Sequence, residues 1–161
     1  MTDLQALSDR AALIDLVARV AYAEDDKDYD AFRALFADSV HVDMRTLHGG
    51  EAQEITADEL TERARRALDG FEYTQHSAAN VLVTLDGDRA QVRANVTAYH
   101  HVPTEPGIDD YCTVRVYWNL GCVRAGERWL IDRVHVVRDG PVQGYFGVYR
   151  LAAERAAARE Q

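Results

Sequence analysis

The sequence predicts an α+β fold in which helices cover one face of a curved antiparallel sheet. Two observations carry this prediction. Apolar residues recur at helical spacing in the first third of the chain, and from Tyr73 onward the pattern changes to alternation with a period of two. Short Gly-containing turns then divide the second part into hairpins. A sheet rolled over helices leaves a pocket at its open end, so we expect a small-molecule site there.

The helical part begins with residues 4–26, where apolar residues repeat every three to four positions until an acidic cluster ends the pattern. A second, short helix is predicted over residues 30–36, and a short alternating strand over 39–44. Residues 45–55 are expected to form a loop. Thr56 and Glu59 then form a capping box that starts a helix ending near Leu68.

Four long strands are predicted, and they pair as two hairpins: residues 74–85 with 89–102, and residues 111–124 with 128–138. Asp86-Gly87-Asp88 is a strong hairpin turn. Residues 103–110 are expected to form a longer loop and residues 145–151 a short strand. The tail, 152–161, is expected to be a frayed end or the end of a helix.

Length and charge limit the classes of function. The 161 residues fit one domain, 1–161, and the net charge of −9 argues against nucleic acid or an anionic membrane surface as a partner. No apolar run approaches the roughly 18 residues of a membrane span, and no signal peptide is visible, so we expect a cytoplasmic protein. Cys112 and Cys122 lie ten residues apart on one predicted strand, about 33 Å, which is too far for a disulfide.

Three segments carry a family resemblance: RAALIDLVARVAYAEDDKDYDAFRALFAD (10–38), TQHSAANVLVTLDGDRAQVRANVTAYHH (74–101) and RWLIDRVHVVRDG (128–140). They resemble the SnoaL-like branch of the nuclear transport factor 2-like superfamily, in particular scytalone dehydratase-like proteins. The resemblance implies a cone-shaped fold whose curved antiparallel sheet covers three N-terminal helices. The superfamily contains dehydratases, polyketide cyclases, isomerases, epoxide hydrolases and noncatalytic members, so the fold alone does not fix the reaction.

The same resemblance implies an Asp–His pair formed by Asp25, at the end of the first helix, and His76, at the start of the first long strand. A carboxylate that orients an imidazole lets it abstract a proton, which is the chemistry expected of such a pair. The alternative is that Asp25 is one of several acidic residues that solvate a helix end. A Lys found in some dehydrochlorinase-like relatives corresponds to Val20, so halide elimination is not indicated.

His100 is the expected second pocket histidine, because it shares a strand face with Val92, Ala94, Val96 and Ala98. It is the third candidate catalytic residue: either His100 or the His76 imidazolium would protonate a leaving hydroxyl group. A β-bulge would bring His101 inward instead. The alternative role is a core histidine hydrogen-bonded to the backbone.

Four further residues are predicted to bind substrate or form the pocket wall: Tyr22, Tyr73, Trp118 and Arg138. Tyr22 lies three residues before Asp25 and is a candidate to polarise a carbonyl, although simple packing explains it equally well. Arg138 shares the parity of Val134 and Val136, so it is either an oxyanion anchor or a solvated residue at the rim. The histidines lack metal-binding spacing, and no nucleotide-binding motif is present, so we expect neither metal nor cofactor.

These features predict a cofactor-independent lyase or isomerase that acts on a small, mostly apolar carbonyl metabolite by Asp–His proton transfer. The alternative is a noncatalytic binding or assembly subunit, which a separation of more than about 6 Å between Asp25 and His76 would favour. We also expect a homodimer or homotrimer, with an interface on the outer sheet face that carries Thr97, Tyr99, Arg115 and Tyr117.

Overall fold

The computed structural model describes residues 3–108 and 110–159. Asp109, in the predicted loop, and residues 160–161, in the predicted tail, lie outside the described residues. The elements, in chain order, are α1 (Asp3–Asp25), α2 (Tyr29–Arg33), β1 (Phe36–Asp43), α3 (Arg45–His48), β2 (Gln53–Thr56), α4 (Ala57–Leu68), β3 (Tyr73–Asp86), β4 (Arg89–His101), β5 (Tyr111–Ala125), β6 (Arg128–Arg138), β7 (Gln143–Gly144) and α5 (Val148–Arg159). The predicted α+β class is confirmed.

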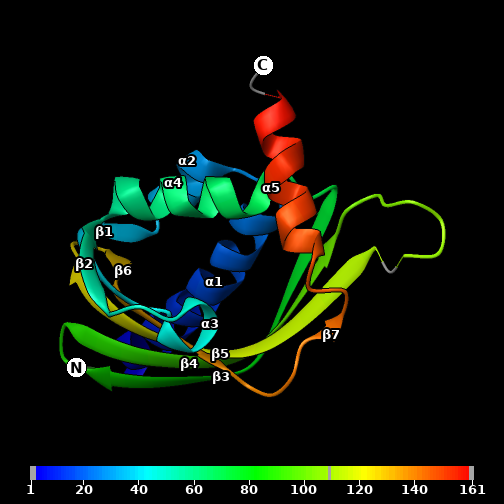
Figure 1. Ribbon diagram of the computed structural model, residues 1–161. Coiled ribbons are helices and arrows are strands. Elements are labelled where there is room, and N and C mark those ends of the chain that lie inside the picture. The colour runs from blue at the N-terminus through cyan, green and yellow to red at the C-terminus, as the bar shows by residue number, and fades with distance from the viewer. Residues whose placement is uncertain (1–2, 109, 160–161) are drawn as a thin grey trace.

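The strands form one curved sheet with the order β2-β1-β6-β5-β4-β3, and the short β7 pairs with β5. Neighbouring strands are antiparallel except β1 and β6, which are parallel. Figure 1 shows α1 inside the curve of the sheet, α4 across its open side and α5 beside the end of α4. The concave face of the sheet and these helices enclose the core.

Two local predictions explain how the helices begin and pack. The hydroxyl of Thr56 accepts a hydrogen bond of 3.1 Å from the backbone N–H of Glu59, so the predicted cap starts α4. On α1, Leu13, Val17 and Val20 are at most 5% exposed and form the stripe that faces the core. This stripe fixes which side of the end of α1 faces inward.

The structure corrects two predicted segments. The expected loop over 45–55 contains α3 and β2, and β2 has a single buried residue, Ile55, because it is a short strand at the sheet edge. The expected strand over 145–151 is wrong, because α5 begins at Val148 and continues to Arg159. Val148 and Ala152 are buried four residues apart, which is helical spacing.

Gly70 lets the end of α4 lie directly against α5. A Cβ at this position would lie 1.7 Å from the backbone oxygen of Ala152, which is far inside contact distance. The glycine therefore allows α5 to close one side of the interior, with its first turn over β4 (Figure 1).

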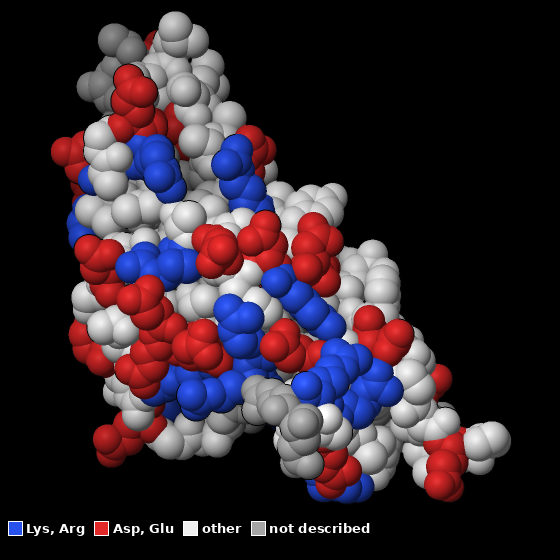
Figure 2. All heavy atoms as spheres, turned by 90° about the horizontal axis from the view of Figure 1, so that it is seen from above, with Lys and Arg blue, Asp and Glu red and all other residues white. Residues whose placement is uncertain are grey.

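The surface carries mixed charge (Figure 2), and both cysteines are buried. Figure 2 shows acidic and basic residues interspersed over the face seen from above, which carries no broad area of a single charge. Cys112 and Cys122 are free and buried on β5, as predicted. Within the described ranges, no helix combines the length and apolar character needed to cross a membrane.

Candidate active site

A cavity of about 400 Å³ lies between the concave face of the sheet and the helices. Its wall is mostly apolar, and a small polar group lies at one side. The polar and ionisable residues of the wall are Glu24, His48, His76, His100, Arg138 and Tyr149. An apolar cavity with a few converging polar groups is the usual form of a small-molecule site.

His76, which lines this cavity, forms a hydrogen-bonded pair with Asp25. Asp25 Oδ1 lies 2.7 Å from His76 Nδ1, and Asp25 Oδ2 accepts a 2.8 Å hydrogen bond from the backbone N–H of His76. The hydroxyl of Thr74 donates a third hydrogen bond, of 3.0 Å, to Asp25 Oδ1. With Nδ1–H donating to the carboxylate, the neutral imidazole has its basic lone pair on Nε2.

The backbone explains why these residues meet although 51 positions separate them. Asp25 is the last residue of α1, and α1 packs along β3. On β3, Thr74 and His76 share the inward face because alternate residues point to the same side. The end of α1 thus places the Asp25 carboxylate beside the start of β3.

Glu24 is a further ionisable residue of the site, and it is not among the residues predicted from the sequence. Its Oε2 lies 3.5 Å from His76 Nε2, and among the described residues this buried oxygen has no hydrogen-bond partner. Glu24 continues the buried stripe of α1, four residues after Val20. That spacing is the signal that would have separated it from its solvated acidic neighbours.

Burial and charge act on the pKa values of these three groups in different ways. Burial acts to raise the pKa of Asp25, but hydrogen bonds from His76 and Thr74 outweigh it and hold that pKa below its ordinary value. Burial raises the pKa of Glu24, and the neighbouring Asp25 charge adds to the effect. Burial acts to lower the pKa of His76, but the carboxylates of Glu24 and Asp25 outweigh it and raise that pKa.

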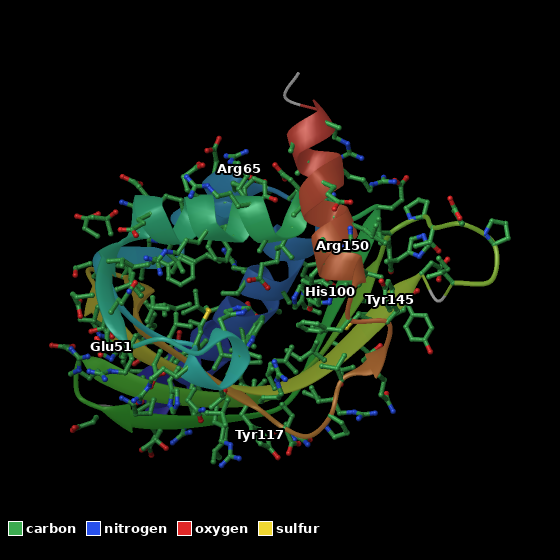
Figure 3. The ribbon with its side chains drawn as sticks, viewed as in Figure 1. Glu51, Arg65, His100, Tyr117, Tyr145 and Arg150 are labelled. Atoms are coloured by element: carbon green, nitrogen blue, oxygen red, sulfur yellow. The ribbon has the colours of Figure 1, made fainter. Side chains whose placement is uncertain are left out.

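His100 lies on the inner face of β4 and lines the cavity, whereas His101 lies on the opposite face. Figure 3 shows His100 beneath α5 and Tyr117 on the outer side of the sheet. The hydroxyl of Tyr149 lies 3.2 Å from His100 Nδ1, and the rings of His76 and His100 are 5.5 Å apart. Burial and the charge of His76 lower the pKa of His100 to about 4, so it is neutral at pH 7. A neutral imidazole argues against the proton-donor role expected for it.

Two of the predicted binding residues line the cavity. Trp118 packs in its wall, with its ring 6.1 Å from that of His76. Arg138 donates a hydrogen bond from Nη2 to the backbone oxygen of Leu47, while its buried Nε has no hydrogen-bond partner among the described residues. His48 lines the same cavity, and burial together with the Arg138 charge lowers its pKa.

The other two predicted binding residues lie outside this cavity. Tyr22 is 70% exposed because its position on α1 is about 200° around the helix from Glu24, so it faces away from the core. Tyr73 is 52% exposed on the outer sheet face, where its ring is 6.1 Å from that of Tyr99. Its parity is opposite to that of Thr74 and His76.

No group of three or more His, Cys, Asp or Glu side chains in the described ranges is arranged to hold a metal ion. What the site offers is acid–base chemistry: one carboxylate that stays ionised, one imidazole beside it, and one carboxyl group that is the easier of the two to protonate.

Comparison with known proteins gives the family. The model of the SnoaL-like domain matches residues 5–135, which is most of the chain. No curated protein matches the chain in sequence.

Solved structures share the fold over nearly their whole length. The Kfla4162 protein of Kribbella flavida has a TM-score of 0.82 and 26% identity, over 91% of this chain and 98% of that one. A provisionally assigned scytalone dehydratase of Novosphingobium aromaticivorans has a TM-score of 0.75 and 18% identity, over 90% and 92%. A type 2 hexachlorocyclohexane dehydrochlorinase (LinA) has a TM-score of 0.74 and 16% identity, over 91% and 95%.

At identities of 16–18%, the last two similarities show the fold alone. The match to the domain model, together with these structures, supports the resemblance noted in the sequence. The chain belongs to the SnoaL-like domain family.

Proposed function

We propose that this protein is a cofactor-independent lyase or isomerase, of the dehydratase or cyclase type, which acts on a small and mostly apolar carbonyl compound. The observation that carries the proposal is the 2.7 Å contact between Asp25 and His76 at the edge of an apolar cavity of about 400 Å³. This contact is much shorter than the separation of about 6 Å that would have favoured a noncatalytic subunit.

His76 is the base in this proposal. Asp25 holds the imidazole with Nδ1–H toward the carboxylate, so Nε2 is free to take a proton from the carbon next to a carbonyl group. Asp25 also stabilises the imidazolium that forms, because it stays ionised. Both effects lower the barrier of the first step that dehydration, isomerisation and cyclisation share.

Arg138 is the proposed partner of the enolate oxygen. It is on the last long strand, lines the same cavity, and has a buried Nε without a hydrogen-bond partner in the described part of the chain. A donor held in an apolar environment stabilises developing negative charge more strongly than it would in water. The apolar wall, including Trp118, favours an aromatic or polycyclic substrate body.

The test uses the aldol adduct of benzaldehyde and acetone, an aryl β-hydroxy ketone that loses water to give a strongly absorbing enone. Absorbance measures elimination, and proton NMR in D₂O measures exchange next to the carbonyl. We expect His76→Gln and Asp25→Asn each to reduce both rates by about 10²-fold, because each removes the base or its orientation. The double variant should be little slower than the slower single variant.

The matched controls are Asp26→Asn, on the exposed residue beside Asp25, and His135→Gln, on a histidine outside the cavity. Both should keep the wild-type rates. Full activity in correctly folded His76→Gln protein would refute the proposal, and so would failure of the wild type to promote either exchange or elimination. Multiplicative losses in the double variant would show that the two residues act separately.

A further inference from the structure

Glu24 has a position that packing alone does not explain. Its side chain is 18% exposed, yet Oε2 is buried and has no hydrogen-bond partner among the described residues. A buried carboxylate without a partner is costly, because the charge loses its hydration and gains nothing in return. The stable forms of such a group are a neutral carboxylic acid or an ion pair with a nearby cation.

His76 lies close to this oxygen and can change its charge. Its Nε2 lies 3.5 Å from Glu24 Oε2, on the side of the ring opposite to the Asp25 contact at Nδ1. One proton therefore has two places to reside: on Nε2, as an ion pair, or on Oε2, as a neutral acid beside a neutral imidazole. The total charge of the site is the same in both forms.

We propose that Glu24 is the general acid of the site and shares one proton with His76. The inference deepens the proposed function, on which it rests, and assigns the substrate class: a β-hydroxy carbonyl compound, whose hydroxyl group leaves as water. Glu24, whose side chain is 18% exposed, and His76 line the same cavity, so one bound molecule can present its acidic C–H bond to Nε2 and its hydroxyl group to the Glu24 carboxyl group.

The proton balance closes within the site. Nε2 of His76 takes the proton from the carbon next to the carbonyl, and the C–H electron pair forms the new C=C bond. The C–O bond breaks, its electron pair leaves on oxygen, and the Glu24 carboxyl group supplies the proton that completes the water molecule. The imidazolium then returns its proton to the Glu24 carboxylate across the 3.5 Å contact, which restores the starting form.

His100 cannot take this role at neutral pH, because it is neutral there and its Nδ1 lies beside the Tyr149 hydroxyl. The titratable or charged groups near Glu24 come from the surrounding elements, and they include Asp25 on α1, Tyr29 on α2, His48 on α3, Glu51 before β2, Arg63 on α4, His76 on β3, His100 on β4, Arg138 on β6 and Tyr149 on α5. Of these, His76 and Asp25 have the resolved effects on the pKa of Glu24.

The first test needs no substrate. Infrared spectra near pH 7 should show the carbonyl band of a buried, neutral carboxylic acid, and Glu24→Gln should remove it. The control Glu62→Gln, on an exposed residue of α4, should leave the band unchanged. NMR titration of labelled histidines should show that Glu24→Gln lowers the pKa of His76, because a carboxylate no longer stabilises the imidazolium.

The second test compares two rates with the aryl β-hydroxy ketone. Exchange needs only the base, whereas elimination also needs the acid. Glu24→Gln should therefore slow elimination by about 10²-fold and change exchange by less than about tenfold. Its elimination rate should also lack the fall at high pH that the wild type shows when the shared proton is lost.

The outcomes separate this inference from the proposed function. If the wild type eliminates water and Glu24→Gln does so equally fast, Glu24 is not the acid, whereas the base role of His76 stands. If the wild type promotes neither reaction, the proposed function fails. In that case the two spectroscopic measurements still test the shared proton. It is rejected if Glu24→Gln leaves the pKa of His76 unchanged, or if the infrared band of the neutral carboxylic acid is absent. It is supported if the variant lowers that pKa and removes that band.

Discussion

His100 makes the stability of the protein depend on pH in a way that can be calculated. Its side chain is 5% exposed, and burial next to His76 lowers its pKa from 6.5 to about 4. Between these two values the unfolded chain binds a proton at this position and the folded protein does not. The folded state therefore loses stability as the pH falls through 6.5, and the loss levels off near pH 4.

The size of the effect follows from the two pKa values. Between about pH 7.5 and pH 5.5, proton binding to the unfolded chain at this residue lowers the free energy of unfolding by about 1.3 kcal/mol. Over the full range the loss reaches about 3.4 kcal/mol, since each pKa unit is worth about 1.36 kcal/mol. The lower pH lies above the isoelectric point of about 5.0, where precipitation would interfere.

The perturbation is His100→Gln, which removes the titrating group and keeps a polar side chain. Urea unfolding at the two pH values gives the free energy of unfolding, and the quantity of interest is the difference between them. On acidification, the free energy of unfolding of the wild type should fall by about 1.3 kcal/mol more than that of His100→Gln. Packing losses in the variant act at both pH values and cancel in this difference, and the remaining titrating groups largely cancel between the two proteins.

His101→Gln is the control, because His101 lies on the opposite face of β4. It should show the same acid sensitivity as the wild type. Equal losses in wild type and His100→Gln would refute the reasoning, because His100 would then titrate normally in the folded protein. That result would also make His100 a candidate proton donor near neutral pH again.

Three further predictions concern packing, the cavity and assembly. Gly70→Ala should lower the free energy of unfolding by about 1–3 kcal/mol, since its Cβ would meet the backbone of Ala152, and an unchanged urea midpoint would contradict this. Ala98→Leu should fill part of the cavity and raise KM for the aryl ketone with little change in stability; unchanged kinetics would place the substrate elsewhere. Light scattering should give a homodimer or homotrimer, formed through the outer face of Thr97, Tyr99, Arg115 and Tyr117, and Arg115→Glu should weaken it. A monomer mass at micromolar concentration would remove this proposal.

Much of the fold could be predicted because its signals are local. The hairpin predicted from residues 74–85 and 89–102 is β3 and β4, at Tyr73–Asp86 and Arg89–His101. Alternation and turn residues act over a few positions, so they are readable without the tertiary structure. β2 was not predicted and the start of α5 was predicted as a strand, because each depends on a distant partner: β1 for the strand, and the end of α4 for the helix.

The site was less predictable, because the residue types in the acidic cluster at the end of α1 do not indicate which carboxylate faces inward. The family resemblance indicates Asp25, whereas nothing in the acidic cluster itself distinguishes Glu24 from its solvated neighbours. Only the stripe of Val17 and Val20, extended by one turn, indicates that Glu24 faces the core. Tyr22 was selected for its spacing from Asp25, but spacing along a helix fixes proximity and not the side that faces the core.

Asp25 and Glu24 are adjacent carboxylates, yet their surroundings shift their pKa values in opposite directions. α1 turns about 100° per residue, so Asp25 projects toward the backbone of β3 while Glu24 projects toward the cavity. Asp25 accepts three hydrogen bonds and remains an anion that orients His76. Glu24 accepts none from the described residues, so the cavity favours its neutral form. The His76 imidazole thus contacts the ionised Asp25 at Nδ1 and faces the Glu24 carboxyl group, which can hold a proton, at Nε2. This arrangement lets a base and an acid act in turn on one substrate.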